Sequence, residues 1–188
     1  MSLPELMRTA AEAANDVVQG VRPDQLSLPT PCADWDVRAL INHLLTTSGH
    51  MSELVARKQP VDLAALMETD FMTGDWAKDY AVQVDKAAAA WALPGATEGE
   101  FAMHGPPYPA EALAGMFLSE LVTHGWDLAR ATGQTLRVSD ELAAAVLELN
   151  AGMAPEGRTQ GLFGEPVTLK EGASTLETAV AIAGRDPR

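Results

Sequence analysis

The residue types best suited to chemistry in this 188-residue sequence are gathered in one stretch, residues 120–133. Within it, Glu120 and His124 are four residues apart, and Asp127 follows three residues later. At about 3.6 residues per turn, these three side chains lie along one face of a helix. A carboxylate and an imidazole on a face that turns toward a core are costly unless something pairs with them. This combination favours a divalent metal as the partner.

The helix that must carry this stretch is predicted over residues 110–131, where apolar residues recur with helical spacing. The stripe that needs burial consists of Leu113, Phe117, Leu121 and Leu128. Gly133 is the expected C-terminal stop. The helix is therefore amphipathic, with its polar chemistry close to the buried face.

A second predicted helix, over residues 37–57, supplies two more histidines. His43 lies in its middle, and His50, seven residues on, is expected close to the same face. Taken alone, His43 is a core or interface histidine that hydrogen-bonds a neighbour. Beside Glu120 and His124 on a later helix it becomes a metal ligand, because bundles often build metal sites from inward-facing residues of separate helices.

The remaining pattern predicts an all-α protein whose domain covers residues 1–188. Its expected parts are a helix over 4–20, a helical region over 61–91 with a break at Gly74, a Pro- and Gly-rich connector over 93–109, a fifth helix starting after Ser139, an irregular tail over 152–175 and a last short helix over 176–183. We expect a four-helix core over about residues 3–133. The connector is a long crossover, and residues 134–188 form a short helical C-terminal extension.

Composition limits the function classes. A formal net charge of −13 argues against partners that need a basic surface, both nucleic acid and anionic membranes. We find no apolar run long enough to span a bilayer and no basic-then-apolar leader. The one cysteine excludes an internal disulfide framework. The expectation is a soluble cytoplasmic protein that acts without nucleic acid or membrane.

Two long motifs resemble those of the DinB-like metal-binding superfamily, in the branch that contains mycothiol-dependent maleylpyruvate isomerase. They are TPCADWDVRALINHL at residues 30–44 and ELVTHGWDLARATG at residues 120–133. The endings FGEPV at 163–167 and GRDP at 184–187 are similar to those of short members of the branch.

The resemblance implies a DinB-like four-helix bundle that holds a divalent metal through a histidine of the second helix and a Glu-x3-His pair of the later one. In this sequence these are His43, Glu120 and His124. Two imidazoles and one carboxylate leave positions open for water or substrate. Zinc and nickel are the expected metals, and iron is tolerated. The branch also implies mycothiol or a related thiol as a reacting partner.

Four further residues have two interpretations each. Asp127 is an acceptor that orients a ligand histidine, or else it forms an ion pair with Arg130 or is a helix-surface charge. His50 is a pocket base or substitute ligand, or a polar residue near the bundle mouth. His104 overhangs the site or is a solvated loop histidine. Cys32 is a reactive thiol or a small buried residue.

The two aromatic residues within these motifs have a plainer interpretation. Trp35 and Trp126 are expected to be core aromatics, with Cys32 packed beside Trp35.

Two functions from different classes follow. The first is a metal-dependent enzyme that acts on a small molecule, a thiol-dependent transferase or isomerase. The second is a non-catalytic metal-binding or structural helical bundle, and a homodimer through an apolar helix face is compatible with it.

Overall fold

Helices make up nearly all of the regular structure in the computed structural model, which describes residues 1–33, 35–103 and 105–188. The elements in chain order are α1 (Leu3–Gln19), the 3-10 turn η1 (Pro23–Gln25), α2 (Val37–Leu44), the π-helix η2 (Leu45–Met51), α3 (Ser52–Ala56), α4 (Leu63–Glu68), α5 (Trp76–Trp91), β1 (Glu100–Phe101), β2 (Tyr108–Pro109), α6 (Ala110–Thr132), α7 (Asp140–Thr159) and α8 (Thr175–Ile182). The all-α prediction is confirmed.

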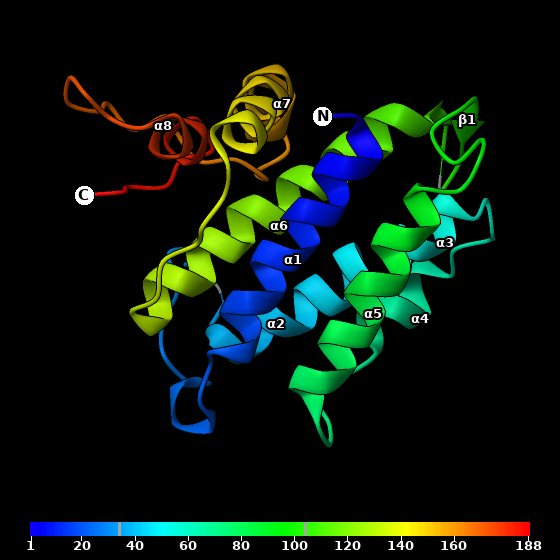
Figure 1. Cartoon of the computed structure of the whole chain (residues 1–188), viewed down its shortest axis with the longest axis horizontal. Coiled ribbons are helices and arrows are strands. Elements are labelled where there is room, and N and C mark those ends of the chain that lie inside the picture. The colour runs from blue at the N-terminus through cyan, green and yellow to red at the C-terminus, as the bar shows by residue number, and fades with distance from the viewer. Residues whose placement is uncertain (34, 104) are drawn as a thin grey trace. The chain divides into compact units, whose positions relative to one another are not determined.

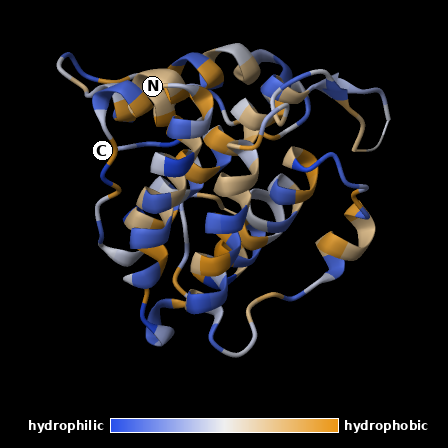
Figure 2. Cartoon of the chain, turned by 45° about the vertical axis from the view of Figure 1, so that its right-hand side comes forward, coloured by the Kyte–Doolittle hydropathy of each residue, from blue (hydrophilic) through white to orange (hydrophobic). Residues whose placement is uncertain are grey.

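Four rods form the bundle. α1 packs against both α5 and α6, and Figure 1 shows α1 and α6 running side by side. The fourth rod is the continuous run α2–η2–α3, which contacts α6 through α2 and α5 through η2 and α3. Each rod therefore has two neighbours, and the apolar stripes meet in the middle. Figure 2 shows hydrophobic and hydrophilic segments interleaved along the helices, as amphipathic helices require.

The core forms where the sequence places its largest apolar side chains at helical spacing. Leu40, Leu44, Phe117 and Leu121 have at most 1% of their surface exposed. Trp91 closes the α5 side, and its indole nitrogen donates to the hydroxyl of Ser52 at 2.9 Å, so the buried N–H is satisfied. The buried leucines and Phe117 lie on α2 and α6, the two helices that carry the predicted ligands and that contact each other.

The predicted helix over 37–57 is continuous but not uniform. Asp36 caps its start by accepting a hydrogen bond from the backbone of Ala39 at 2.8 Å. Its middle is a π-helix, in which the hydroxyls of Thr46 and Thr47 donate to the carbonyls of Asn42 and His43. Such hydroxyl-to-carbonyl bonds compete with the regular ladder. The wider i→i+5 turn shifts the direction of every side chain that follows it.

The region over 61–91 splits as the sequence predicts. Gly74 has a φ of 60°, a conformation that glycine adopts at no steric cost, and it separates α4 from α5. The expected extended piece in the connector exists as β1, which pairs antiparallel with β2. The 93–109 connector thus contains a two-stranded sheet, and β2 leads directly into α6.

The chain divides into two compact units, residues 1–136 and 137–188. The second unit corrects one sequence prediction, because α7 continues to Thr159 although Pro155 lies inside it. Contacts with α8 hold the second half of α7: Asn150 donates to the carbonyl of Ala179, and Arg158, in the last turn, donates to that of Ile182. The expectation of a single domain over residues 1–188 stays a prediction.

Among the helices that the structure describes, none is both long enough and apolar enough to span a membrane.

Candidate metal centre

Two helices place the three predicted ligands. His43 lies in the last turn of α2, directly before the π-helix begins. Glu120 and His124 lie four residues apart on α6, a helix of 23 residues that ends at Gly133. Because α2 and α6 are neighbours in the bundle, residues that are 77 positions apart in sequence come into contact.

The three side chains form a tight cluster around the carboxylate. Nε2 of His43 lies 2.8 Å from Oε2 of Glu120, and Nε2 of His124 lies 3.5 Å from the same oxygen. The two imidazole rings meet edge to face with centroids 5.0 Å apart. One donor atom from each residue lies within 4.8 Å of the others. With bonds of about 2.0–2.1 Å, neighbouring ligands of a tetrahedral ion are about 3.3 Å apart, so the donor set fits one ion.

Burial is graded across the cluster. The His124 side chain is 8% exposed, that of His43 is 17% exposed and that of Glu120 is 30% exposed. One side of the cluster therefore reaches the surface while the other is closed by the bundle. Such a site can exchange a small molecule and still keep its ligands fixed.

A fully buried carboxylate orients His124. Oδ2 of Asp127 lies 2.9 Å from Nδ1 of His124, and the Asp127 side chain has no exposed surface. Since an ionised carboxylate can only accept, the ring donates from Nδ1, and Nε2 is the ring atom that faces Glu120. The interpretation of Asp127 as a helix-surface charge is wrong, and the role of an orienting acceptor agrees with the geometry.

The indole of Trp35 covers the cluster, a position that the sequence did not predict. The hydroxyl of Thr30 donates to the carbonyl of Trp35 at 2.8 Å and accepts from the backbone of Cys32 at 3.1 Å, so it ties both residues to Thr30. The indole of Trp35 then lies 4.3 Å from the His43 ring and 5.7 Å from the His124 ring, between centroids. Trp35 is therefore a site residue, and only half-buried, whereas Trp126 is a core aromatic as expected.

The same loop brings Cys32 to the buried side of His124. Its sulfur, a nitrogen of His124 and a carboxylate oxygen of Asp127 form a second group of donors within 4.8 Å of one another. Cys32 is only half-buried, so the expectation of a small buried residue is wrong. The sequence signal for a position near the site was that Cys32 lies in the motif at 30–44, close to Trp35.

The two remaining histidines have different outcomes. His50 does not join the cluster, because the π-helix changes the direction of its side chain; its ring stacks on Phe71 at 4.3 Å instead. It lines a separate cavity. His104 lies outside the residues that the structure describes.

The fold and the site together define a class of protein. It is an all-helical bundle with a cluster of potential metal ligands between two of its rods. The family model of the mycothiol maleylpyruvate isomerase N-terminal domain matches residues 7–129, and the chain belongs to this family. The matched segment contains His43, Glu120 and His124. The resemblance inferred from the two motifs is thereby confirmed.

The chain is also similar to two proteins of Mycobacterium tuberculosis, Uncharacterized protein MT0763 of strain CDC 1551 and Uncharacterized protein Rv0738 of strain H37Rv. Each is 30% identical over 158 residues, which cover 81% of this chain and 80% of the relative. No solved structure was found to match the chain.

Proposed function

We propose that this protein binds one divalent metal ion through His43, Glu120 and His124, and uses it in a thiol-dependent transferase or isomerase reaction on a small molecule. The observation that carries the proposal is the convergence of two imidazole nitrogens and one carboxylate oxygen within 4.8 Å. Zinc and nickel are the metals that we expect for a set of two imidazoles and a carboxylate.

The chain's own residues have separate tasks in this proposal. His43, Glu120 and His124 hold the ion and leave coordination positions open, Asp127 fixes the ring of His124, and Trp35 shields the histidines from bulk water. A divalent ion in such an open site lowers the pKa of a bound water or thiol and so makes a nucleophile available near neutral pH.

The family supports the thiol as partner, since its name refers to a mycothiol enzyme. Glu120 is the most exposed of the three proposed ligands, at 30%, so an incoming thiol would approach from its side. The small-molecule substrate then binds beside the thiol, in the part of the site that Trp35 does not cover.

One observation favours a second function, a non-catalytic metal-binding or structural bundle. The 2.8 Å contact between His43 and Glu120 ties α2 to α6 directly. A cluster of this kind stabilises the bundle whether or not the protein catalyses a reaction. A homodimer remains compatible with this second function.

The first test is the metal content of the purified protein and of a His43→Ala variant, after loading with zinc or nickel. We expect about one ion per chain in the wild type and a loss of affinity of at least about tenfold in the variant, because a three-ligand set loses one ligand. His50→Ala is the matched control, since this histidine follows on the same rod but lies outside the cluster. Equal metal content in all three proteins would contradict the proposal.

A second measurement separates enzyme from structural bundle. In cobalt-loaded Cys32→Ser protein, which has no cysteine of its own, added N-acetylcysteine is expected to give a sulfur-to-cobalt charge-transfer band. If cobalt binds but the thiol adds no band, the site is closed to thiols, and the structural function is favoured.

A further inference from the structure

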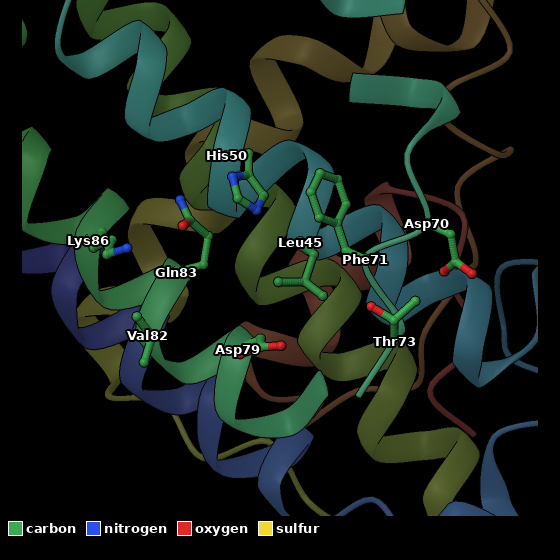
Figure 3. Close-up of a pocket in the computed structure, with 9 residues that line it drawn as sticks. All are labelled: Leu45, His50, Asp70, Phe71, Thr73, Asp79, Val82, Gln83 and Lys86. Atoms are coloured by element: carbon green, nitrogen blue, oxygen red, sulfur yellow. The ribbon is translucent and has the colours of Figure 1, made fainter. Parts of the chain in front are cut away.

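A cavity of about 300 Å³ lies between η2, α5 and residues 69–73, and Figure 3 shows the side chains that line it. Its described lining includes none of His43, Glu120 and His124. Its volume is at the lower end of the range for small-molecule sites. We propose that this cavity binds a small zwitterion, with an amine at one end and a carboxylate at the other end of a short apolar body.

The wall formed by residues 69–73 is fixed by α2. The side chain of Asn42 accepts from the backbone of Phe71 at 2.8 Å and donates to the carbonyl of Thr69 at 3.3 Å. Arg38, one turn earlier, holds Asp70 with contacts of 2.7 and 2.9 Å. This segment has little regular structure of its own, but its backbone and its first carboxylate are both anchored. The cavity therefore keeps its shape without a ligand.

The opposite wall depends on a glycine. A Cβ at Gly49 would lie 3.0 Å from Cγ of Gln83, so the absence of a side chain lets η2 approach α5 closely. Gln83 in turn donates to Glu53 at 2.8 Å, which fixes the direction of its amide. Both walls are thus held by contacts that do not involve a ligand.

The middle of the cavity is apolar with one polar group. Leu45, Phe71 and Val82 supply the apolar surface, and Figure 3 shows His50 beside Phe71. One face of the His50 ring stacks on Phe71 with an interplanar angle of 19°. No described residue hydrogen-bonds its ring nitrogens. Burial lowers the pKa of His50, which Lys86 also lowers and Glu53 raises, so the neutral ring offers one donor and one acceptor near neutral pH.

Two opposite charges line the cavity at different positions along α5. Asp79 and Lys86 both lie on α5 and both line the cavity. Seven residues of helix separate them by about 10 Å along the axis. Neither forms an ion pair within the described part of the chain, whereas the carboxylate of Asp70 is already engaged by Arg38. Both side chains are exposed, so each can form one modest ion pair with a ligand. A ligand with one charge gains one such pair and a zwitterion gains two, so the arrangement favours a zwitterion.

The test uses three probes of one shape. They are para-aminomethylbenzoate, which has both charges, para-methylbenzoate, which has only the carboxylate, and para-methylbenzylamine, which has only the amine. We expect calorimetry on the full chain to show the zwitterion binding about two- to fivefold more tightly than either single-charge probe, the range for one exposed charge pair. No binding of the zwitterion, or equal binding of the three probes, would overturn the proposal.

Variants on α5 locate the binding. Asp79→Asn and Lys86→Met should each remove most of the advantage of the zwitterion. The matched controls Asp85→Asn and Lys78→Met, exposed residues of the same helix outside the cavity, should keep it. Equal effects of the lining and control variants would show binding elsewhere and overturn the proposal.

The proposal is independent of the metal centre. A His43→Ala protein that loses metal should still bind para-aminomethylbenzoate, with the ring protons of His50 shifting in its NMR spectrum. Loss of zwitterion binding in this variant would overturn the assignment of a separate site, even if the metal centre itself is confirmed.

Discussion

At the scale of single residues, Asp127 carries the largest electrostatic cost of the metal centre. A carboxylate with no exposed surface is unfavourable unless it is paired, and here it accepts from the ring of His124. Because Asp127 lies at the buried end of the cluster, water cannot take its place as the acceptor for the His124 ring. The direction of the His124 ring therefore depends on this one side chain.

Replacing Asp127 with Asn tests that dependence. The Asn oxygen can still accept from Nδ1, but the negative charge that increases the basicity of the ring is lost. We expect zinc affinity to fall about 10- to 100-fold, the usual effect of such a partner. Competition with a chelator of known affinity measures it, and denaturant unfolding of the metal-free protein is the control. An affinity within about threefold of the wild type would contradict this role.

The buried hydroxyl of Tyr80 is another residue-scale feature. It has no hydrogen-bond partner among the described residues, and burial raises its pKa. Removal of an unsatisfied buried group relieves its desolvation penalty. We expect Tyr80→Phe to raise the free energy of unfolding by about 1 kcal/mol. Tyr108→Phe, at a residue that is 55% exposed, should change it by less than about 0.5 kcal/mol. A destabilised Tyr80→Phe protein would show that the hydroxyl has a partner.

At the scale of elements, η2 decides which histidine joins the metal centre. Seven positions along a regular helix would bring His50 near the direction of His43. The π-helix between them breaks this relation, and His50 faces α5 and Phe71 instead. This change of helix type thus separates the proposed metal centre from the cavity that His50 lines.

The end of α6 is set by a single glycine. Gly133 has a φ of 72°, in the left-handed region, and its N–H donates to the carbonyl of Ala129. A Cβ there would meet nothing within 4 Å, so a substitution is opposed by backbone conformation alone. We expect Gly133→Ala to destabilise the protein by about 1 kcal/mol in denaturant unfolding.

Gly133→Asn is the matched variant, because Asn tolerates the left-handed region better than Ala. Its loss of stability should be clearly smaller than that of Gly133→Ala. Equal losses in the two variants would mean that something other than the backbone conformation sets the cost.

At the scale of the whole molecule, the chain has two compact units, and the proposed metal centre lies entirely in the first, residues 1–136. All three proposed ligands, together with Asp127 and Trp35, belong to that unit. The unit also has its own apolar core. Its metal chemistry should therefore not require the second unit.

A fragment of residues 1–136 tests this. We expect it to fold and to bind one metal ion per chain with an affinity within about threefold of the full protein, as measured by chelator competition and circular dichroism. An unfolded fragment would instead support the single domain over residues 1–188 that the sequence predicts.

The sequence by itself determined the helices and three proposed ligands. Helical spacing of apolar residues predicted α1, α5 and α6 because amphipathic periodicity is a local property. Glu120, His124 and Asp127 share a face for the same reason. His43 was added by comparing residue types on two inward-facing helices.

Tertiary structure alone decided the rest. One such feature is the π-helix. Thr46 and Thr47 can be read from the sequence, but the carbonyls to which their hydroxyls donate are known only from the structure. Trp35 reaches the histidines because a loop is folded back over α2, and α7 continues through Pro155 because α8 holds its end. These features arise from contacts between residues far apart in sequence, and no local pattern encodes such contacts.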